Sequence, residues 1–349
     1  MLLLIIIINP MFGIYRTILA LLVVAFHLLK LPIIGYYSVH GFFILSGYLM
    51  TYIMQHTYSY SFKGIKRFIS NRLLRLYPIY WAVLLISTAI LFYIGDNSLS
   101  YHSKLYLPHG LTEIIQNLTF IYWDFFPTKA SPRISPTSWA LTIEIFFYIL
   151  IGLGISRSKK NVIIWCVLSI VYFAYTHFQN LGFTYRYHNI ISGSLTFSIG
   201  AITYFWKNEL SNLLRKISIT QLIIIAIANI AITYLSRKIG LSIIENFCFY
   251  LNYLIHMSII ILLMDIKTSK RLKKIDIFIG RFSYPIYLIH WQIGLLITFS
   301  IYNSSVIGLH KKGLIVFFAT ILLTIIVSYF LIKLIEEPID KVRKKIKST

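Results

Sequence analysis

This sequence is poor in charged residues and in cysteine. Only 13% of its 349 residues are charged, whereas 58% are hydrophobic, and the mean hydropathy is +0.75. A soluble domain of this length would carry far more charge, so the composition indicates an integral membrane protein. The two cysteines, Cys166 and Cys248, lie within apolar stretches, where neither a disulfide nor a thiolate metal site is expected. No metal site is predicted elsewhere in the chain.

Acidic residues are scarce as well. The chain holds 11 aspartates and glutamates against 33 lysines and arginines, which gives a formal net charge of +22. Such an excess can indicate nucleic-acid binding, but here the basic residues lie between apolar stretches instead of forming one basic domain. This placement is typical of membrane topology signals, so we predict membrane lipids as surroundings and no nucleic-acid partner.

Apolar runs long enough to cross about 30 Å of hydrocarbon occur along the whole chain. They predict an all-α, polytopic membrane bundle of about ten transmembrane helices, which forms a single domain over residues 1–349 with a short lead-in at 1–12. No small-residue cleavage site follows the lead-in, so a removed signal peptide is not expected. The predicted spans are 13–31, 35–55, 76–95, 138–156, 161–178, 189–206, 219–236, 243–264, 277–299 and 313–335.

Lysine and arginine orient the predicted bundle, because cytoplasmic loops carry their excess. Alternate connections are basic, whereas the longest intervening one, 96–137, balances basic and acidic residues. We therefore expect both termini and the basic tail at 339–349 to be cytoplasmic, and loop 96–137 to lie outside. The basic residues of the inner connections are Lys63, Lys66, Arg67, Arg72 and Arg75; Arg157, Lys159 and Lys160; Lys207, Arg215 and Lys216; and Lys267, Lys270, Arg271, Lys273 and Lys274.

Ionisable residues occur inside several predicted spans. Arg16 lies eleven positions before His27, about three helical turns, so both side chains project from one helix face about 16 Å apart. Arg16 lies near the cytoplasmic mouth, while four groups share the outer half to the midplane: His27, His40, Glu144 and His290. Such groups are tolerated mainly where they face the bundle interior, so the pattern predicts a polar cavity with a basic inner end.

Simpler interpretations of these residues remain open from the sequence. A buried histidine such as His40 or His256 can hydrogen-bond a backbone carbonyl or one of the 26 tyrosines. Arg72 and Arg75 can be ordinary positive-inside anchors at the start of a span. Packing and topology therefore compete with function at each of these positions.

Six short strings stand out along the chain: GIYRTILALLVVAFH at 13–27, VHGFFILSGYLM at 39–50, NRLLRLYPIYW at 71–81, SWALTIEIFFY at 138–148, GRFSYPIYLIHW at 280–291, and Glu337-Pro338. Together they resemble the membrane-bound acyltransferase 3 family of mainly bacterial multispan proteins, nearly from end to end. One such string is a weak match. All six in the family's order are a specific one.

The resemblance implies a reaction and a location. It implies an O-acyltransferase of the bacterial inner membrane that moves an acyl group, usually acetyl, from cytoplasmic acyl-CoA to a hydroxyl at the outer face. A sugar of the lipopolysaccharide O-antigen is the first expected acceptor, followed by exopolysaccharide or peptidoglycan and then a small lipid-linked molecule. Acyl transfer to a hydroxyl needs a base for the attacking proton and donors for the developing oxyanion.

The same resemblance suggests roles for individual residues. His27 suits the base, and Glu144, at a similar depth, is expected to hold its tautomer or to stabilise the imidazolium. Arg72 and Arg75 are expected to bind the phosphates of acetyl-CoA bidentately, and Arg16 to hold the CoA or its pantetheine arm below His27. The remaining predicted cavity residues are His40, Ser46, Ser138, Trp139, Tyr284, His290 and Trp291.

Two features depart from the family pattern. His40 stands just before the aromatic pair of the second string, where many relatives carry an acidic or other polar residue, so acceptor positioning is expected to differ. The chain also ends soon after Glu337-Pro338, so no fused extracytoplasmic hydrolase domain of the SGNH type is expected.

Two other function classes compete with the acyltransferase interpretation. A transporter or flippase of a lipid-linked or small polar substrate would also bury histidine and glutamate along a passage, but no internal repeats are visible. A membrane glycosyltransferase would be expected to carry acidic residues in its first large outer loop. Asp96 and Asp124 are isolated there.

Overall fold

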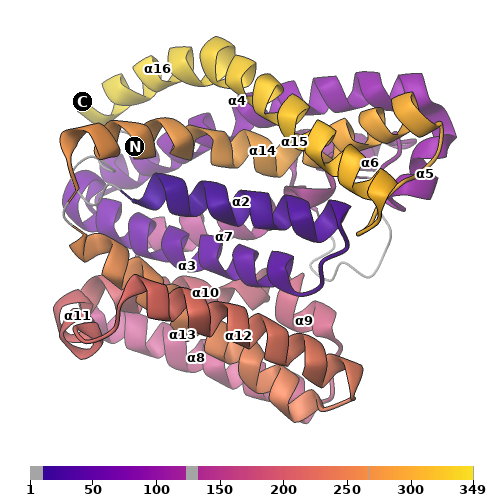
Figure 1. Cartoon of the computed structure of the whole chain (residues 1–349). Helices are drawn as coiled ribbons and strands as arrows, with labels where there is room; N and C mark the ends of the chain where they lie inside the picture. The colour runs from indigo at the N-terminus through magenta and orange to yellow at the C-terminus, as the bar shows by residue number, and fades with distance from the viewer. Residues whose placement is uncertain (1–10, 123–132, 267, 349) are drawn as a thin grey trace.

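The structure, a computed structural model, describes residues 11–122, 133–266 and 268–348. This part of the chain is helical, and no strand occurs in it. The predicted lead-in at 1–12 lies almost wholly outside the described residues, as do residues 123–132 of the loop at 96–137. Figure 1 shows long helices running side by side, with short helices at both ends of the bundle.

A long helix occupies the place of each predicted span: α2 (Phe12–Leu28), α3 (Ile34–Ile53), α4 (Phe62–Ile94), α7 (Trp139–Leu153), α8 (Lys159–Phe178), α10 (Gly193–Phe205), α12 (Ile219–Lys238), α13 (Ser242–Asp265), α14 (Lys270–Tyr302) and α15 (Lys311–Leu331). The short helical segments are η1 (Met54–Tyr58), η2 (Gly95–Asn97), α5 (Ser98–Tyr101), α6 (Leu111–Thr119), η3 (Pro136–Ser138), α9 (Phe183–Tyr187), η4 (Ile190–Ser192), α11 (Lys207–Leu214), η5 (Ile332–Glu336) and α16 (Glu337–Ser348).

Within the described residues, seven helical segments are long and apolar enough to cross a membrane by length and composition. They contain α4, α7, α8, α12, α13, α14 and α15, while Phe12–Leu28 and Ile190–Phe205 are shorter apolar helices. The structure therefore supports a multi-pass membrane protein. The count of about ten spans stays a prediction.

Two helices extend well beyond their predicted spans. The 33 residues of α4 begin at Phe62 instead of 76, and the 33 residues of α14 begin at Lys270 instead of 277. Both starts are capped, because the hydroxyl of Ser61 accepts from Gly64 N at 3.1 Å and that of Ser269 from Leu272 N at 3.2 Å. The basic residues that precede each apolar run thus continue the helix instead of forming a loop.

Glycines allow the closest helix contacts in the bundle. α2 lies beside α14, where a Cβ atom on Gly280 would come within 2.5 Å of the Cα atom of Gly13. α3 lies beside α10, where a Cβ atom on Gly200 would come within 2.1 Å of the carbonyl oxygen of Ile44. Small residues of this kind let helix backbones approach in membrane bundles. The close contact at Gly13 and Gly280 brings the side chains of α2 and α14 together.

The basic connections gather at one end of the bundle, which we call the basic end: the starts of α4, α8 and α14, together with α11 and α16 (Figure 1). Contacts between successive connections hold them there. Arg157 lies over the ring of Tyr60, Lys159 lies over Trp206, and Lys207 pairs with Asp265 at 3.8 Å. The other end, which we call the opposite end, carries α5, α6 and α9.

Candidate active site

α2 and α14 bring two histidines into contact. His27 Nδ1 lies 2.8 Å from His290 Nε2, and the two rings stack with an angle of 9° and centroids 5.1 Å apart. The second ring nitrogen of His290, Nδ1, lies 3.1 Å from the carbonyl oxygen of Ile286, one turn earlier in α14. His290 is fully buried, whereas His27 is only partly so.

These partners determine which nitrogen of each neutral ring carries the proton. A carbonyl oxygen can only accept, so His290 donates through Nδ1–H to Ile286 and its Nε2 is an acceptor. His27 must then donate through Nδ1–H to His290. The lone pair of His27 Nε2 is left to take a proton from another molecule. The arrangement therefore suits His27 as a base and His290 as the group that orients it.

Aromatic rings surround the histidine pair. The ring of Trp291 lies 4.8 Å from that of His27 and 4.5 Å from that of His102, which directly follows α5. Tyr101 packs edge-on against the same tryptophan, with centroids 5.5 Å apart. Sequence reasoning missed His102, because it lies in a connection rather than in a span and nothing in its neighbourhood marks it.

A pocket lies between this pair and the basic end, with walls from α2, α3, α4, α7 and α14. Its volume is about 70 Å³. Glu144 of α7 lies in its wall and accepts hydrogen bonds from the hydroxyl of Ser46, at 2.9 Å, and from that of Tyr148. Six of the predicted residues line this pocket together: Arg16, Ser46, Arg72, Arg75, Glu144 and Tyr284.

His27 and Glu144 do not meet. The hydrogen-bond partners of Glu144 are Ser46 and Tyr148, whereas that of His27 is His290. The expected role of Glu144 in orienting His27 is therefore corrected, because His290 occupies that place. Tyr148 was also missed, although its spacing of four residues from Glu144 places it on the same face of one helix.

The segment before α7 explains why Glu144 lies deeper than expected. The hydroxyl of Ser135 donates to the carbonyl oxygen of Leu288, and that of Thr137 to the carbonyl oxygen of Tyr287, both at 3.1 Å. This segment therefore already lies beside the part of α14 that carries the histidine. Glu144 comes six residues after the end of η3, about 9 Å further toward the basic end.

A second, smaller pocket adjoins the first at the basic end. Both are lined by Arg16, Arg75 and Tyr284. The second adds ionisable residues from α14 and from the C-terminal segment: Asp276, Arg281, Glu336, Asp340 and Arg343. Together the two pockets are lined by five arginines and by four residues with carboxylate groups.

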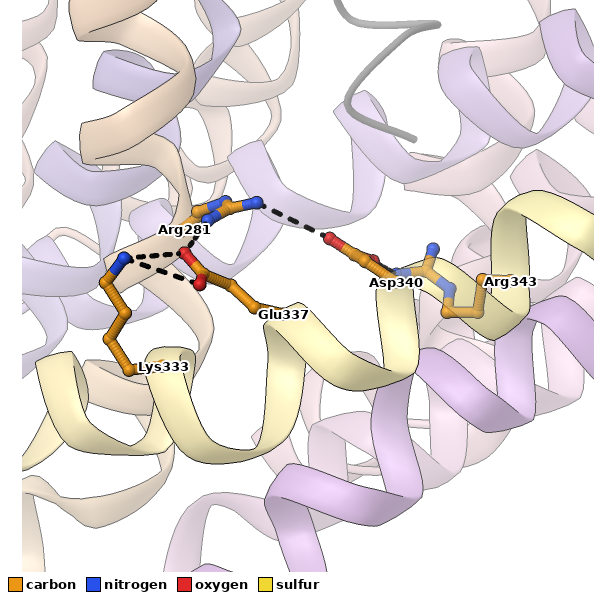
Figure 2. Close-up of polar contacts among 5 residues, drawn as sticks. All are labelled: Arg281, Lys333, Glu337, Asp340 and Arg343. Carbon is orange, nitrogen blue, oxygen red and sulfur yellow. Dashed lines mark hydrogen bonds and ion pairs between the residues drawn. The ribbon is translucent and has the colours of Figure 1, made fainter.

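Ion pairs hold α16 against α14 at this second pocket (Figure 2). Arg281 pairs with Glu337 at 2.8 Å and with Asp340 at 3.7 Å, and Lys333 also pairs with Glu337, at 3.1 Å. Arg343 completes the group through Asp340 at 2.5 Å. The Glu337-Pro338 string thus places its carboxylate on an arginine of α14.

α16 also contacts Arg72 of α4 through one asparagine. Asn71 donates from Nδ2 to the carbonyl oxygen of Arg343 at 3.0 Å, and its Oδ1 accepts from Arg72 at 3.0 Å. Arg72 is only 3% exposed. A guanidinium this deeply buried in the pocket wall is more than a surface anchor, which favours the functional interpretation of Arg72.

His40 belongs to the packing between α3 and α13. It is buried, its Nδ1 lies 3.3 Å from Asn252 Nδ2, and its ring meets those of Tyr253 and Phe249 edge-on. Neither of the two pockets is lined by it. His256, bonded to a tyrosine hydroxyl at 2.7 Å, is a packing residue of the same kind. These contacts favour the simpler interpretation of both histidines.

The other predicted cavity residues lie in different surroundings. Ser138 shares a hydrogen bond of 2.7 Å with the hydroxyl of Tyr122, and Trp139 packs against the ring of His188 at 4.6 Å. Both residues lie where η3 meets α7, directly after Thr137, which bonds to Tyr287 of α14. Tyr284 lines both pockets and donates its hydroxyl to the carbonyl oxygen of Leu76 at 2.9 Å.

Comparison with known protein families decides the class of this site. The model of the acyltransferase 3 family, described as an acyltransferase domain, matches residues 13–333. The chain belongs to this family. No curated protein and no solved structure matched it. The match runs from the first turn of α2 to the start of η5, so it includes both histidines of the pair and every residue of the first pocket.

The described residues of this membrane acyltransferase include no group of three or more histidine, cysteine, aspartate or glutamate side chains placed to hold a metal ion. The donor groups that the structure does bring together are imidazole and guanidinium. These groups can accept a proton and bind phosphate oxygens, respectively.

Proposed function

We propose that this acyltransferase moves an acetyl group from acetyl-CoA, bound at the basic end, to a hydroxyl of a surface glycan presented at the opposite end. The acceptor that we propose is a sugar of the lipopolysaccharide O-antigen. The single observation that carries the proposal is the His27–His290 pair, whose hydrogen bonds leave His27 Nε2 as an acceptor. An arginine-lined pocket lies between this pair and the basic end.

The arginines of the two pockets supply the features that a CoA ester would need. Arg16, Arg72 and Arg75 line the first pocket and can bind phosphate oxygens with planar, charged donors. Arg16 lies about 16 Å from His27 along α2. An extended pantetheine arm has a comparable reach, so a thioester held by these arginines can approach the histidine pair.

The proposed chemistry is a direct transfer. His27 Nε2 accepts the proton of the acceptor hydroxyl as its oxygen attacks the thioester carbonyl carbon. The carbon–oxygen bond forms, the carbon–sulfur bond breaks, and the sulfur leaves with the proton returned from the imidazolium. His290 Nε2 holds the imidazolium through the bond that it already accepts from Nδ1–H. No acyl-enzyme intermediate is required.

Two measurements test this function. Membranes that contain the protein should transfer radiolabelled acetyl from acetyl-CoA to surface glycan, and membranes without it should not. In cells, glycan from a strain that lacks the gene should lose an O-acetyl signal in the NMR spectrum. Identical glycans from both strains, together with no transfer in membranes, would contradict the proposal.

The proposal places the basic end at the cytoplasm and the protein in a bacterial inner membrane, because basic residues predominate on the inner side. A cysteine introduced at Arg215, in the connection after α11, should resist a membrane-impermeant reagent in intact cells and react once the membrane is opened. A cysteine at Ser103, after α5, should react in intact cells. The reverse pattern would invert the assignment of donor and acceptor sides.

A further inference from the structure

A third pocket lies at the opposite end of the bundle, where α3, α9, α12 and α13 meet. Its volume is about 30 Å³, which is room for about two or three water-sized groups. Aromatic rings and polar side chains line it together, among them Tyr36, Phe183, Arg186, Arg237, Glu245 and Asn246. Aromatic walls with a few polar groups are typical of pockets that bind small organic ligands.

The polar side chains of the third pocket are held in position by neighbours. Arg186 donates from Nη1 to the carbonyl oxygen of Leu181 at 2.9 Å, and Arg237 donates from Nε to Glu245 Oε1, also at 2.9 Å. A guanidinium has five N–H donors, more than the Leu181 carbonyl can engage. Asn246, the residue after Glu245, is half-buried and has an amide that both donates and accepts. The pocket therefore offers several donors and acceptors to a ligand rich in hydroxyl groups.

A series of ring contacts connects the third pocket to His27. The ring of Phe26, the residue before His27, lies 4.9 Å from the ring of His27 and 4.8 Å from that of Tyr36. The ring of Tyr36 in turn lies 5.1 Å from that of Phe183. A Cβ atom on Gly35 would come within 2.4 Å of Phe26 Cγ, so glycine at this position lets the ring pack between the two sites. The pocket is thus close to the proposed base and fixed relative to it.

The backbone at one wall of this pocket is strained. Ile33, just before α3, has φ of 75° and ψ of −44°, and the N–H of Ile34 donates to the carbonyl oxygen of Pro32 at 2.8 Å. This is a γ-turn with positive φ, which is rare and unfavourable, above all for a β-branched residue. Ile33 is only 1% exposed and lines the pocket. Strain of this kind persists where the surrounding structure enforces it, and it is frequent at ligand sites.

We propose that the third pocket binds a sugar unit of the acceptor glycan that does not react, next to the unit whose hydroxyl meets His27. The C–H face of a sugar ring packs against an aromatic ring, while its hydroxyl groups exchange hydrogen bonds with guanidinium, carboxylate and amide groups. Tyr36 and Phe183, both half-buried, supply ring surface, and the pocket admits one polar edge of the sugar. The inference rests on the proposed function and narrows the acceptor to an oligosaccharide or polymer of at least two units.

The length of the acceptor is the first test. Unacylated glycan from a strain that lacks the gene should be cut by mild acid into fragments, which are separated by size and offered to membranes that contain the protein. Addition of a second unit should lower the acceptor KM about tenfold, because it adds a ring contact and hydrogen bonds in the pocket. Equal KM values for single units and longer fragments would overturn the inference and leave the acyltransferase function intact. If no fragment is acylated, the proposed function itself fails.

The second test removes groups that line the third pocket. Phe183→Leu and Asn246→Ala should each raise KM for the two-unit fragment about threefold to tenfold. KM for the single unit, KM for acetyl-CoA and kcat should stay unchanged, which a general loss of structure would not produce. Phe247→Leu is the matched control, because Phe247 follows Asn246 in α13, is 66% exposed and does not line the pocket. Equal KM values for the native protein, both pocket variants and the control would overturn the inference.

A third test measures binding without catalysis. Asn246→Cys should be made in a protein whose Cys166 and Cys248 are replaced by alanine, and its reaction with a thiol reagent followed in opened membranes. The two-unit fragment should slow this reaction several-fold, and it should not slow the reaction of Phe247→Cys in the same background. Equal rates with and without the fragment would overturn the sugar site. Protection without any acetyl transfer would support the site and contradict the proposed function.

Discussion

The histidine pair and the first pocket differ in the charged groups that surround them. At the histidine pair, two neutral imidazoles bond to each other among aromatic rings, with no carboxylate among the contacts that the described residues make there. In the first pocket, Glu144 lies among three arginines and is bonded by two hydroxyl groups. One region suits proton transfer and the other suits binding of an anion. In the mechanism that we propose, a second histidine takes the place of the carboxylate of a triad.

There is a physical reason why the carboxylate lies near the arginines and not near the histidines. A base that must take a proton benefits from a partner that fixes its tautomer, and a neutral acceptor nitrogen does so without placing a full negative charge in hydrocarbon. Arginines that bind phosphate carry permanent charge into a low-dielectric pocket, so a carboxylate nearby offsets part of that cost. Glu144 therefore belongs with the arginines. The substitutions below separate the two regions.

The largest effect is expected at the base. His27→Gln should lower acetyl transfer about 100- to 10,000-fold, the usual contribution of general base catalysis, while acetyl-CoA binding and membrane insertion persist. Turnover should be measured in membranes at matched expression, and donor binding by displacement of a labelled CoA ester. His56→Gln is the control, because His56 is exposed in η1 and bonds only to the hydroxyl of Tyr204 among its described contacts. Near-normal turnover by His27→Gln would show that this histidine is not the general base.

At the arginines, the expected effect is on KM for acetyl-CoA instead of on turnover. Replacement of Arg72 and Arg75 together by alanine should raise KM for acetyl-CoA at least about 100-fold, since hydrogen bonds to charged groups contribute about 1.5–3 kcal/mol each. Lysine should rescue only part, because an ammonium does not reproduce the planar fork. Lys63 and Lys66, both exposed at the start of the same helix, provide the matched alanine control. An unchanged KM for acetyl-CoA would mean that both arginines act only as positive-inside topology signals.

Glu144 sharpens the comparison, because its two possible roles predict different kinetics. If it belongs with the arginines, Glu144→Gln should keep the hydrogen bonds of Ser46 and Tyr148 and change KM for acetyl-CoA by about tenfold or less, with kcat mildly affected. If it supported His27, kcat would fall nearly as far as in His27→Gln. Steady-state kinetics on the two variants side by side distinguish these outcomes.

Much of the helical framework was predictable from apolar runs, and the family strings identified most of the residues that meet in the first pocket. Which of these residues contact one another was harder to predict. The depth of each residue in the membrane was counted from the expected end of its span, and those ends were inexact. The count placed Glu144 beside His27, whereas the hydrogen bonds of residues 134–137 to α14 show that η3 already lies at the depth of the histidine pair. A connection that runs into the bundle in this way leaves no periodic pattern of apolar residues in the sequence. His102 was hidden for the same reason, since it lies in a connection.

The smallest expected effect concerns the pairs that hold α16 at the basic end. Arg281 and Glu337 are partly shielded, with side chains 19% and 34% exposed, whereas Arg237 and Glu245 at the opposite end are 42% and 28% exposed. Exposed pairs contribute about 0–1 kcal/mol, so the Arg281–Glu337 coupling should lie near the top of that range and the Arg237–Glu245 coupling near zero. Double-mutant cycles with glutamine, read by thermal unfolding in detergent, measure both. Since α16 borders the second pocket, Arg281→Gln should also raise KM for acetyl-CoA slightly, and Arg237→Gln should not. Equal couplings and equal KM values at the two ends would mean that α16 contributes nothing to the donor side beyond an ordinary surface contact.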